Sequence, residues 1–188
     1  IFLISCDVTE KSDQVSLQYN RFERALFSIN SQNVDSELDS LRKNFGSFTE
    51  MFETQIMHKA NIDESLYSEE VLQFINHPDM REAYDSVALL FADFSDVEYE
   101  LNKAFFVFSN LFPSYQLPEI TTFFGGFNYG VVTYDNNIAI GLENFLGIES
   151  KYYKLLGDPK YLRFHKQRKY IVPNIMEVWF NEHFEGYI

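Results

Sequence analysis

The residues best able to bind a metal or move a proton in this chain are its four histidines, His58, His77, His165 and His183. No two of them stand four residues apart, and none lies in H-E-x-x-H or H-x-x-E-H, where one helix face presents two imidazoles to zinc. His183 belongs to an apolar helical face, where a histidine with satisfied hydrogen bonds is far commoner than a metal ligand. The spacing therefore predicts no helical zinc site.

Other patterns that carry catalysis or bind ions are also incomplete. The chain has no G-x-S-x-G around an activated serine. Gly125-Gly126 precedes strand-type residues and lacks the Gly-Lys-Ser/Thr of a phosphate loop. Asp135-Asn136-Asn137 lacks the alternating acids and later glutamate of a calcium loop, and a tight turn explains it better. We therefore expect no catalytic residue, no cofactor, no metal, and a protein that is not an enzyme.

The single cysteine, Cys6, stands where a short apolar segment changes abruptly to a charged one. Residues 1–4 have the composition of the end of a secretory hydrophobic region, and Leu3-Ile4-Ser5-Cys6 resembles a bacterial lipobox. Acyl chains on Cys6 would hold a water-soluble body on a bilayer. We expect residues 1–6 to be the remnant of a lipoprotein signal peptide and residues 7–14 to be a polar tether. The alternative is a buried structural Cys6.

The net negative charge comes entirely from the first part of the chain. The net charge is −13, and the first 100 residues hold 20 acidic side chains against 7 basic ones, whereas the rest hold 8 of each. Because an acidic surface repels the phosphate backbone, we expect no nucleic-acid partner. No segment approaches the roughly 18 consecutive apolar residues of a membrane-spanning helix.

One basic run in the second part interrupts this pattern. It comprises Lys160, Arg163, Lys166, Arg168 and Lys169, with no acid among them. Three interpretations stay open: a solvated helix face, a contact for the acidic part of the same molecule, or a contact with anionic lipid headgroups.

Strand patterns and helix patterns occupy different parts of the chain. Residues 15–19 alternate apolar and polar side chains, and residues 117–124, 129–134 and 138–142 have the composition of strands, the last two joined by a tight turn. The region between the first strand and residue 112 shows helical periodicity. This predicts an α+β fold that is mainly helical, with a small mixed or antiparallel sheet of about four strands.

The last predicted helix begins near Val172-Pro173, and its apolar residues recur at three, four and seven up to Phe184. Its apolar stripe runs almost to Ile188, so we expect the natural protein to continue and supply a further packing partner. We assign residues 15–188 to a single α+β domain, truncated at its C-terminus.

Several short motifs, in this order, resemble the gliding-motility lipoprotein B (GldB-type) family. They are the lipobox, Arg21-Phe22-Glu23-x-x-Leu26-Phe27, Phe112-Pro113, Asn128-Tyr129, Ile138-Ala139-Ile140-Gly141-Leu142-x-x-Phe145-Leu146-Gly147, Tyr152-Tyr153 and Val172-Pro173. The resemblance covers nearly the whole chain.

The resemblance implies a lipid-anchored protein of the cell envelope, at the periplasmic side of a bacterial membrane, that serves motility or secretion machinery. It also implies a fold similar to zinc metallopeptidases. Asn174-Ile175-Met176-Glu177-Val178 stands where a peptidase would have H-E-x-x-H, so the resemblance favours a non-catalytic descendant that binds a protein or peptide by strand addition. The alternative is a membrane-tethered hydrolase whose catalytic residues lie outside this sequence.

Overall fold

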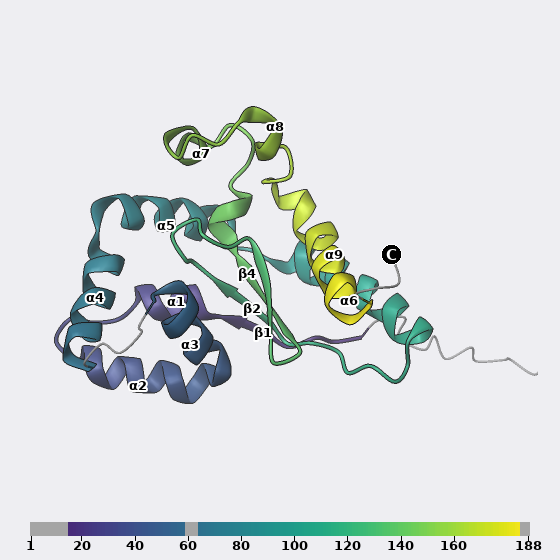
Figure 1. The fold of residues 1–188 in the computed structure, drawn as a ribbon, viewed down its shortest axis with the longest axis horizontal. Helices are drawn as coiled ribbons and strands as arrows, with labels where there is room; N and C mark the ends of the chain where they lie inside the picture. The colour runs from purple at the N-terminus through teal and green to yellow at the C-terminus, as the bar shows by residue number, and fades with distance from the viewer. Residues whose placement is uncertain (1–14, 59–63, 185–188) are drawn as a thin grey trace, which may run out of the picture.

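A mixed four-stranded sheet with helices on both faces is the centre of the computed structural model, which describes residues 15–58 and 64–184 (Figure 1). Cys6 and the predicted tether, residues 7–14, lie outside the described residues. The strands are β1 (Tyr19–Arg21), β2 (Ile120–Phe123), β3 (Val131–Tyr134) and β4 (Asn137–Gly141).

The helices fall into two groups along the chain. Before the sheet is completed come α1 (Phe22–Phe27), α2 (Val34–Phe45), α3 (Ser47–Met51), the π-helical turn η1 (Phe52–Ile56), α4 (Glu64–Asn76), α5 (Pro78–Leu90) and α6 (Ser95–Leu111). After β4 come the 3₁₀ turn η2 (Leu142–Phe145), α7 (Lys151–Leu155), α8 (Lys160–Arg163), the 3₁₀ turn η3 (Arg168–Tyr170) and α9 (Ile171–Phe184).

The sheet has the strand order β1-β2-β4-β3. Strands β1, β2 and β4 are parallel, and β3 pairs antiparallel with β4. The long helical region from α1 to α6 separates β1 from β2, as the crossover between parallel neighbours requires. The predicted α+β class and the mixed sheet of about four strands are confirmed.

The alternation of residues 15–19 predicts the first strand too early in the chain. Leu17 donates its backbone N–H to the side-chain oxygen of Asn102 on α6 (3.0 Å) and not to a neighbouring strand. Ladder pairing begins at Tyr19, opposite Ile120, so β1 covers residues 19–21 and not 15–19. The tight turn is confirmed, because Asp135 and Asn136 both have positive φ (42° and 63°), as a two-residue hairpin of type I′ demands.

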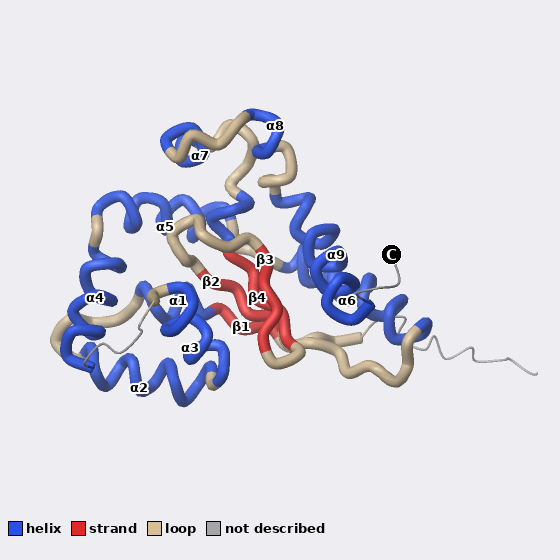
Figure 2. Tube along the Cα trace, in the orientation of Figure 1, coloured by secondary structure: helices blue, strands red, loops and turns tan. Residues whose placement is uncertain are grey.

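Aromatic side chains fill the space on both faces of the sheet. Phe48 of α3 packs against Phe22, Phe123 and Tyr134 with ring centroids 4.8, 5.8 and 5.2 Å away. On the other face, Trp179 of α9 packs edge-on against Phe105 of α6 at 5.6 Å. Figure 2 shows the strands between these two sets of helices. The 18% aromatic content of the chain thus builds the core.

The apolar stripe of the last helix is confirmed, since Ile171, Ile175 and Trp179 are buried on α9. Among the described residues, no helix combines the length and apolar character needed to cross a membrane.

Gly141 marks the tightest backbone approach in the sheet. A Cβ atom at this position would lie 2.1 Å from the carbonyl oxygen of Tyr129. The amide of Gly141 donates to the carbonyl of Gly130 at 2.8 Å, so the hairpin cannot move away without losing this hydrogen bond. Only glycine therefore fits the end of β4.

We predict that Gly141→Ala lowers the free energy of unfolding by about 3 kcal/mol or more, because the methyl group collides with backbone and not with a flexible side chain. Gly130→Ala is the matched control. Its Cβ would meet only Asn144 Cβ at 3.7 Å, so we expect a change below about 1 kcal/mol. Urea denaturation of both variants measures the difference, and equal midpoints would contradict it.

Candidate functional site

Glu143 is a fully buried carboxyl group just beyond the end of β4. Its Oε1 accepts hydrogen bonds from the backbone N–H of Gly125 (2.7 Å) and of Phe127 (3.1 Å). Its Oε2 has no hydrogen-bond partner among the described residues. The side chain therefore ties the loop after β2 to the end of β4.

Burial raises the pKa of Glu143 to about 7, since ionisation without water is costly. The two backbone N–H groups oppose this rise, and the negative charge of Glu23 adds to it. Glu23 is itself buried and is held by Arg21 Nε (2.7 Å) and Thr122 Oγ1 (2.6 Å). Because Glu143 has no exposed surface, it positions the loop and does not face solvent.

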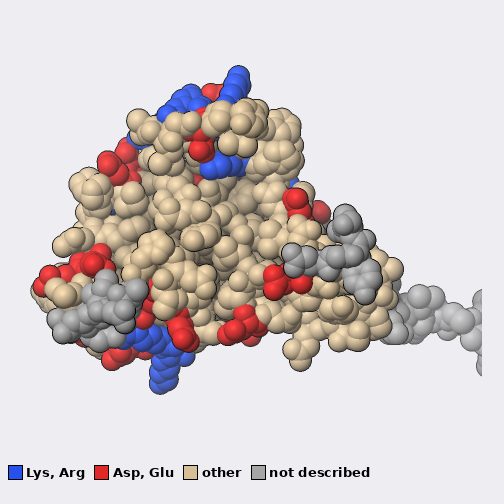
Figure 3. All heavy atoms as spheres, in the orientation of Figure 1, with Lys and Arg blue, Asp and Glu red and all other residues tan. Residues whose placement is uncertain are grey.

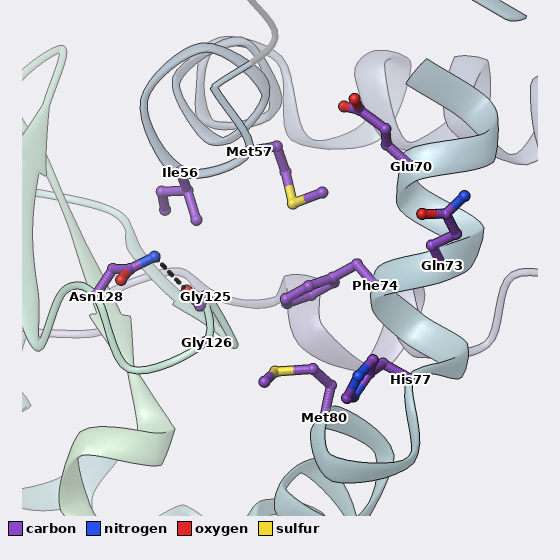
Figure 4. A pocket seen from close by; sticks show the side chains of 10 residues that line it. All are labelled: Ile56, Met57, Glu70, Gln73, Phe74, His77, Met80, Gly125, Gly126 and Asn128. Atoms are coloured by element: carbon purple, nitrogen blue, oxygen red, sulfur yellow. Dashed lines mark hydrogen bonds between the residues drawn. The ribbon is translucent and has the colours of Figure 1, made fainter. Parts of the chain in front are cut away.

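A hollow of ≈ 480 Å³ lies beside this loop, between α4, the start of α5 and the end of η1 (Figure 4). Met57, Phe74 and Met80 point into it, and Gly125 and Gly126 form one side. Asn128 holds the loop by donating to the Gly125 carbonyl at 3.2 Å. Methionine side chains adapt to many shapes, so the hollow can accept an apolar group.

The outer edge of β3 is the second candidate site. Val132 and Tyr134 pair directly with Ala139 and Asn137 of β4, and the bond from Gly141 to Gly130 fixes the alternation of the ladder. The backbone N–H and C=O of Val131 and Thr133 must then face away from β4. We find no hydrogen bond to these four groups from the described part of the chain.

Two hollows flank this edge, and both are lined by Thr133, Tyr134 and Asp135. The one toward α9 has ≈ 490 Å³ and includes Glu182 and His183. The one toward α3 has ≈ 370 Å³ and is lined on that side by polar residues such as Ser47, Glu50, Thr54 and Gln55. An added strand would therefore find unpaired backbone groups with space for side chains on both sides.

The opposite sheet edge is more enclosed. The segment leading into β1 is held by α6, where the hydroxyl of Tyr19 bonds to the Glu98 carbonyl at 3.0 Å and to Asn102 Oδ1 at 3.1 Å. Burial next to this helix and the nearby Glu98 charge raise the pKa of Tyr19, so its hydroxyl stays protonated. Of the two edges, β3 is the better candidate for accepting a partner.

The histidines that could have formed a site have structural roles or stand apart. His183 lies near two hydrogen-bond partners, the Trp179 carbonyl at 2.9 Å and Asn136 Oδ1 at 2.9 Å. It is half-buried beside a hollow, so the predicted place in the core is wrong. His77 caps α5 by accepting the Asp79 N–H. Within residues 15–58 and 64–184, no group of three or more His, Cys, Asp or Glu side chains is arranged to hold a metal ion.

The residues of the basic run make different contacts in the structure. Arg168 forms an ion pair with Asp96 of α6 and donates to the carbonyls of Leu90 and Asp93, so the contact with the acidic part of the molecule is confirmed for this residue. Lys166 pairs with Asp158 at 2.8 Å. Lys160 and Lys169 are exposed.

The comparison with protein families decides the assignment. The family described as gliding motility protein GldB matches residues 5–186. The chain belongs to this family. The match begins one residue before Cys6 and covers the sheet, both candidate sites and α9.

GldB family membership supports a role in gliding motility and a lipoprotein of the cell envelope. No curated protein and no solved structure matches the chain significantly. The likeness to zinc metallopeptidases therefore stays a prediction from the sequence. On α9, Asn174 and Val178 are half-buried and Glu177 is exposed.

Glu143 was not singled out from the sequence, although it stands inside the motif from Ile138 to Gly147. A lone glutamate after a strand carries no local signal, and only the fold shows that β2 ends beside it. Its neighbour Gly141 in the same motif was the better clue, because a glycine at the end of a strand indicates a close backbone approach.

We predict that Glu143→Gln removes a pH-dependent loss of stability. Since folding raises the pKa of this group, its contribution is fully present below its unfolded pKa, near 4.5, and is lost as pH rises through 7. The wild type should therefore lose about 3 kcal/mol relative to the variant between pH 4 and pH 9. The amide oxygen can still accept from Gly125 and Phe127.

Chemical denaturation of both proteins across this pH range measures their free energies of unfolding. Glu177→Gln, an exposed position on α9, is the control and should follow the wild-type profile. Parallel profiles for wild type and Glu143→Gln would show that the buried carboxyl group does not titrate in this range.

Proposed function

We propose that this GldB family member is anchored to a bacterial membrane by acyl chains on Cys6, faces the periplasm, and binds a protein or peptide partner of the motility or secretion machinery without catalysing a reaction. The observation that supports the binding role is the outer edge of β3, which lies between two hollows and pairs with no strand of the described residues.

The anchor is supported by the sequence and by the family. Leu3-Ile4-Ser5-Cys6 has the form of a lipobox, and the family match includes it apart from its first two residues. Residues 7–14 are mostly polar or charged, which suits a tether between a bilayer and the folded body that begins near Val15. Two or more acyl chains would hold such a body stably, whereas one would not.

Binding by strand addition is supported by the geometry of the hairpin. The outward groups of Val131 and Thr133 repeat at the spacing that an antiparallel or parallel partner strand needs. The strand is held in place from behind, because Tyr134 donates to or accepts from Thr121 of β2 at 2.8 Å and packs on Phe48. A rigid edge loses little conformational entropy when a partner pairs with it.

The non-catalytic role is supported by the residues of α9. The sequence Asn174-Ile175-Met176-Glu177-Val178 offers no imidazole pair, and His183 lies within hydrogen-bond distance of Trp179 and Asn136. In the described hollows around β3, the hydroxyl of Thr133 donates to Glu182, and His183 contacts Trp179 and Asn136 and not a hydroxyl, so no nucleophile has a histidine base held beside it.

The anchor is tested by expressing the full chain with its complete signal sequence in its own host, with and without Cys6→Ser. We expect the wild type to incorporate labelled palmitate and to enter the detergent phase on Triton X-114 partitioning, and the variant to stay in the aqueous phase without label. Wild-type protein that remains aqueous would rule out the anchor.

Strand addition is tested by Thr133→Pro, which removes one outward N–H and keeps the pairing with β4. Proline is tolerated on an edge strand where its missing N–H faces solvent, so we expect a stability change below about 1 kcal/mol. In a host strain that lacks the gene, this variant should fail to restore colony spreading, because a partner strand loses its donor.

Thr133→Val is the matched control, since it keeps the N–H and the β-branched shape while it removes the hydroxyl near Glu182 (3.3 Å). It should restore spreading. If Thr133→Pro is stably folded and restores spreading as well as Thr133→Val, the outer edge of β3 does not bind the partner. Stoichiometric zinc in purified full-length protein would instead favour a hydrolase.

A further inference from the structure

A small projection formed by α7, α8 and the turn between them carries an unusual set of exposed apolar side chains (Figure 1). We call residues 154–164 the α7–α8 tip. Leu155 is 80% exposed and Tyr161 is 74% exposed, and Leu156, Leu162 and Phe164 are also exposed. Single exposed leucines are ordinary, but five large apolar side chains within ten residues form a patch that indicates a binding surface.

The tip is held firmly at its base. The Tyr153 hydroxyl donates to the Glu143 carbonyl (2.8 Å) and accepts from the Leu146 N–H (2.9 Å). Arg163 donates to the Asp158 carbonyl, and Lys166 pairs with the Asp158 carboxylate. These polar groups are used within the base, so the exposed leucines belong to a fixed structure and not to a frayed end.

Basic side chains surround the apolar ones. Lys154, Lys160 and Lys169 are exposed, and Lys169 lies 5.6 Å from the ring centroid of Phe164. The neighbouring acid Glu149 is paired with Lys154 at 3.2 Å. Figure 3 shows Lys and Arg gathered over α7 and α8 at the top, with a few Asp and Glu among them, and a second basic group among acidic side chains at the bottom of this face.

We propose that the α7–α8 tip inserts into the interface of a bilayer that contains anionic lipids. Leucines and aromatic rings favour the boundary between headgroups and acyl chains. Lysines at the rim keep their charge among the phosphates while their methylenes lie along apolar surface. In a chain with net charge −13, the tip is a surface that combines exposed lysines with exposed apolar side chains, which suits an anionic membrane.

The shape of the tip favours a membrane over an acidic protein partner. The tip projects from the body (Figure 1), and its two most exposed apolar side chains, Leu155 and Tyr161, lie near the turn between its two helices. Protein interfaces concentrate their binding energy in side chains that fill a pocket of the partner, with Leu less common among them than Trp, Tyr and Arg. A fluid bilayer needs no matching pocket, and the free energy gained by inserting a leucine grows with the apolar area that is removed from water.

The insertion is measured on the full chain carrying Cys6→Ser, so that acylation plays no part and a failed anchor cannot be mistaken for a failed tip. Because Cys6 is the single cysteine, a polarity-sensitive NBD label can be placed on Leu155→Cys. We expect its emission to shift to the blue with vesicles of phosphatidylcholine containing 30% phosphatidylglycerol. Label on Leu111→Cys, which is 66% exposed at the end of α6, should not shift.

Two sets of variants separate the apolar part from the charge. Leu155→Ser with Leu156→Ser should weaken vesicle co-sedimentation roughly tenfold or more, since two exposed leucines leave the bilayer without a change in the core. Lys154→Gln with Lys160→Gln should weaken it about fivefold at low salt. Lys43→Gln with Lys103→Gln, two lysines exposed elsewhere, should have a smaller effect.

The proposal is overturned if the Leu155 label shows no blue shift, or if the serine variant binds vesicles as the parent does. If the lysine variants weaken vesicle binding but the serine variants do not, the tip adsorbs to the membrane surface without inserting. The exposed apolar side chains would then indicate an acidic protein as the partner of the tip.

Discussion

The buried residue Glu143 is bonded through its carboxyl group to the loop before the β3–β4 hairpin and through its backbone carbonyl to the base of the α7–α8 tip. Its side chain accepts the N–H groups of Gly125 and Phe127, which fixes the chain between β2 and the β3–β4 hairpin. Its own carbonyl accepts the Tyr153 hydroxyl, which fixes the base of the α7–α8 tip. An apolar interior makes each of these hydrogen bonds costly to lose, because water cannot replace the missing partner. The loop that leads to the β3–β4 hairpin and the base of the tip are therefore both bonded to one buried residue.

In the described structure, few charged side chains near the sheet are free to react, whereas two surfaces are free to make contacts. The charges near the sheet are used within the structure: Glu23 is bonded to Arg21 and Thr122, and Arg168 is bonded to Asp96. What remains available is a row of backbone groups on β3 and an apolar surface on the tip. Backbone pairing and bilayer insertion both work without reactive side chains, which suits the role that we propose at a membrane.

The sequence predicted the parts of the structure that local patterns determine. Alternation and β-branched residues located three strands and the hairpin, and the three-to-four periodicity located α9. It misplaced the first strand, because Leu17 pairs with Asn102, which is 85 residues away, and no local pattern encodes that. It missed Glu143 and the exposure of the tip for the same reason, since Leu155 and Leu156 have the composition of a core helix. Only tertiary packing shows that nothing in the described structure covers them. Cys6 lies outside that structure, so its acylation stays a prediction from the sequence.

A tip of this size would bind a bilayer weakly by itself, and the body around it carries acidic charge that an anionic surface repels. Its effect changes once the chain is tethered through Cys6. A tether of about eight residues would keep the tip at a high local concentration near the headgroups, so that a weak contact would become a persistent one. The acyl chains would then supply the affinity, and the tip would supply the orientation. Because the loop before β3 and the base of the tip are both bonded to Glu143, orienting the tip would also set the direction in which the outer edge of β3 faces, and a partner strand would meet that edge at a defined angle to the membrane.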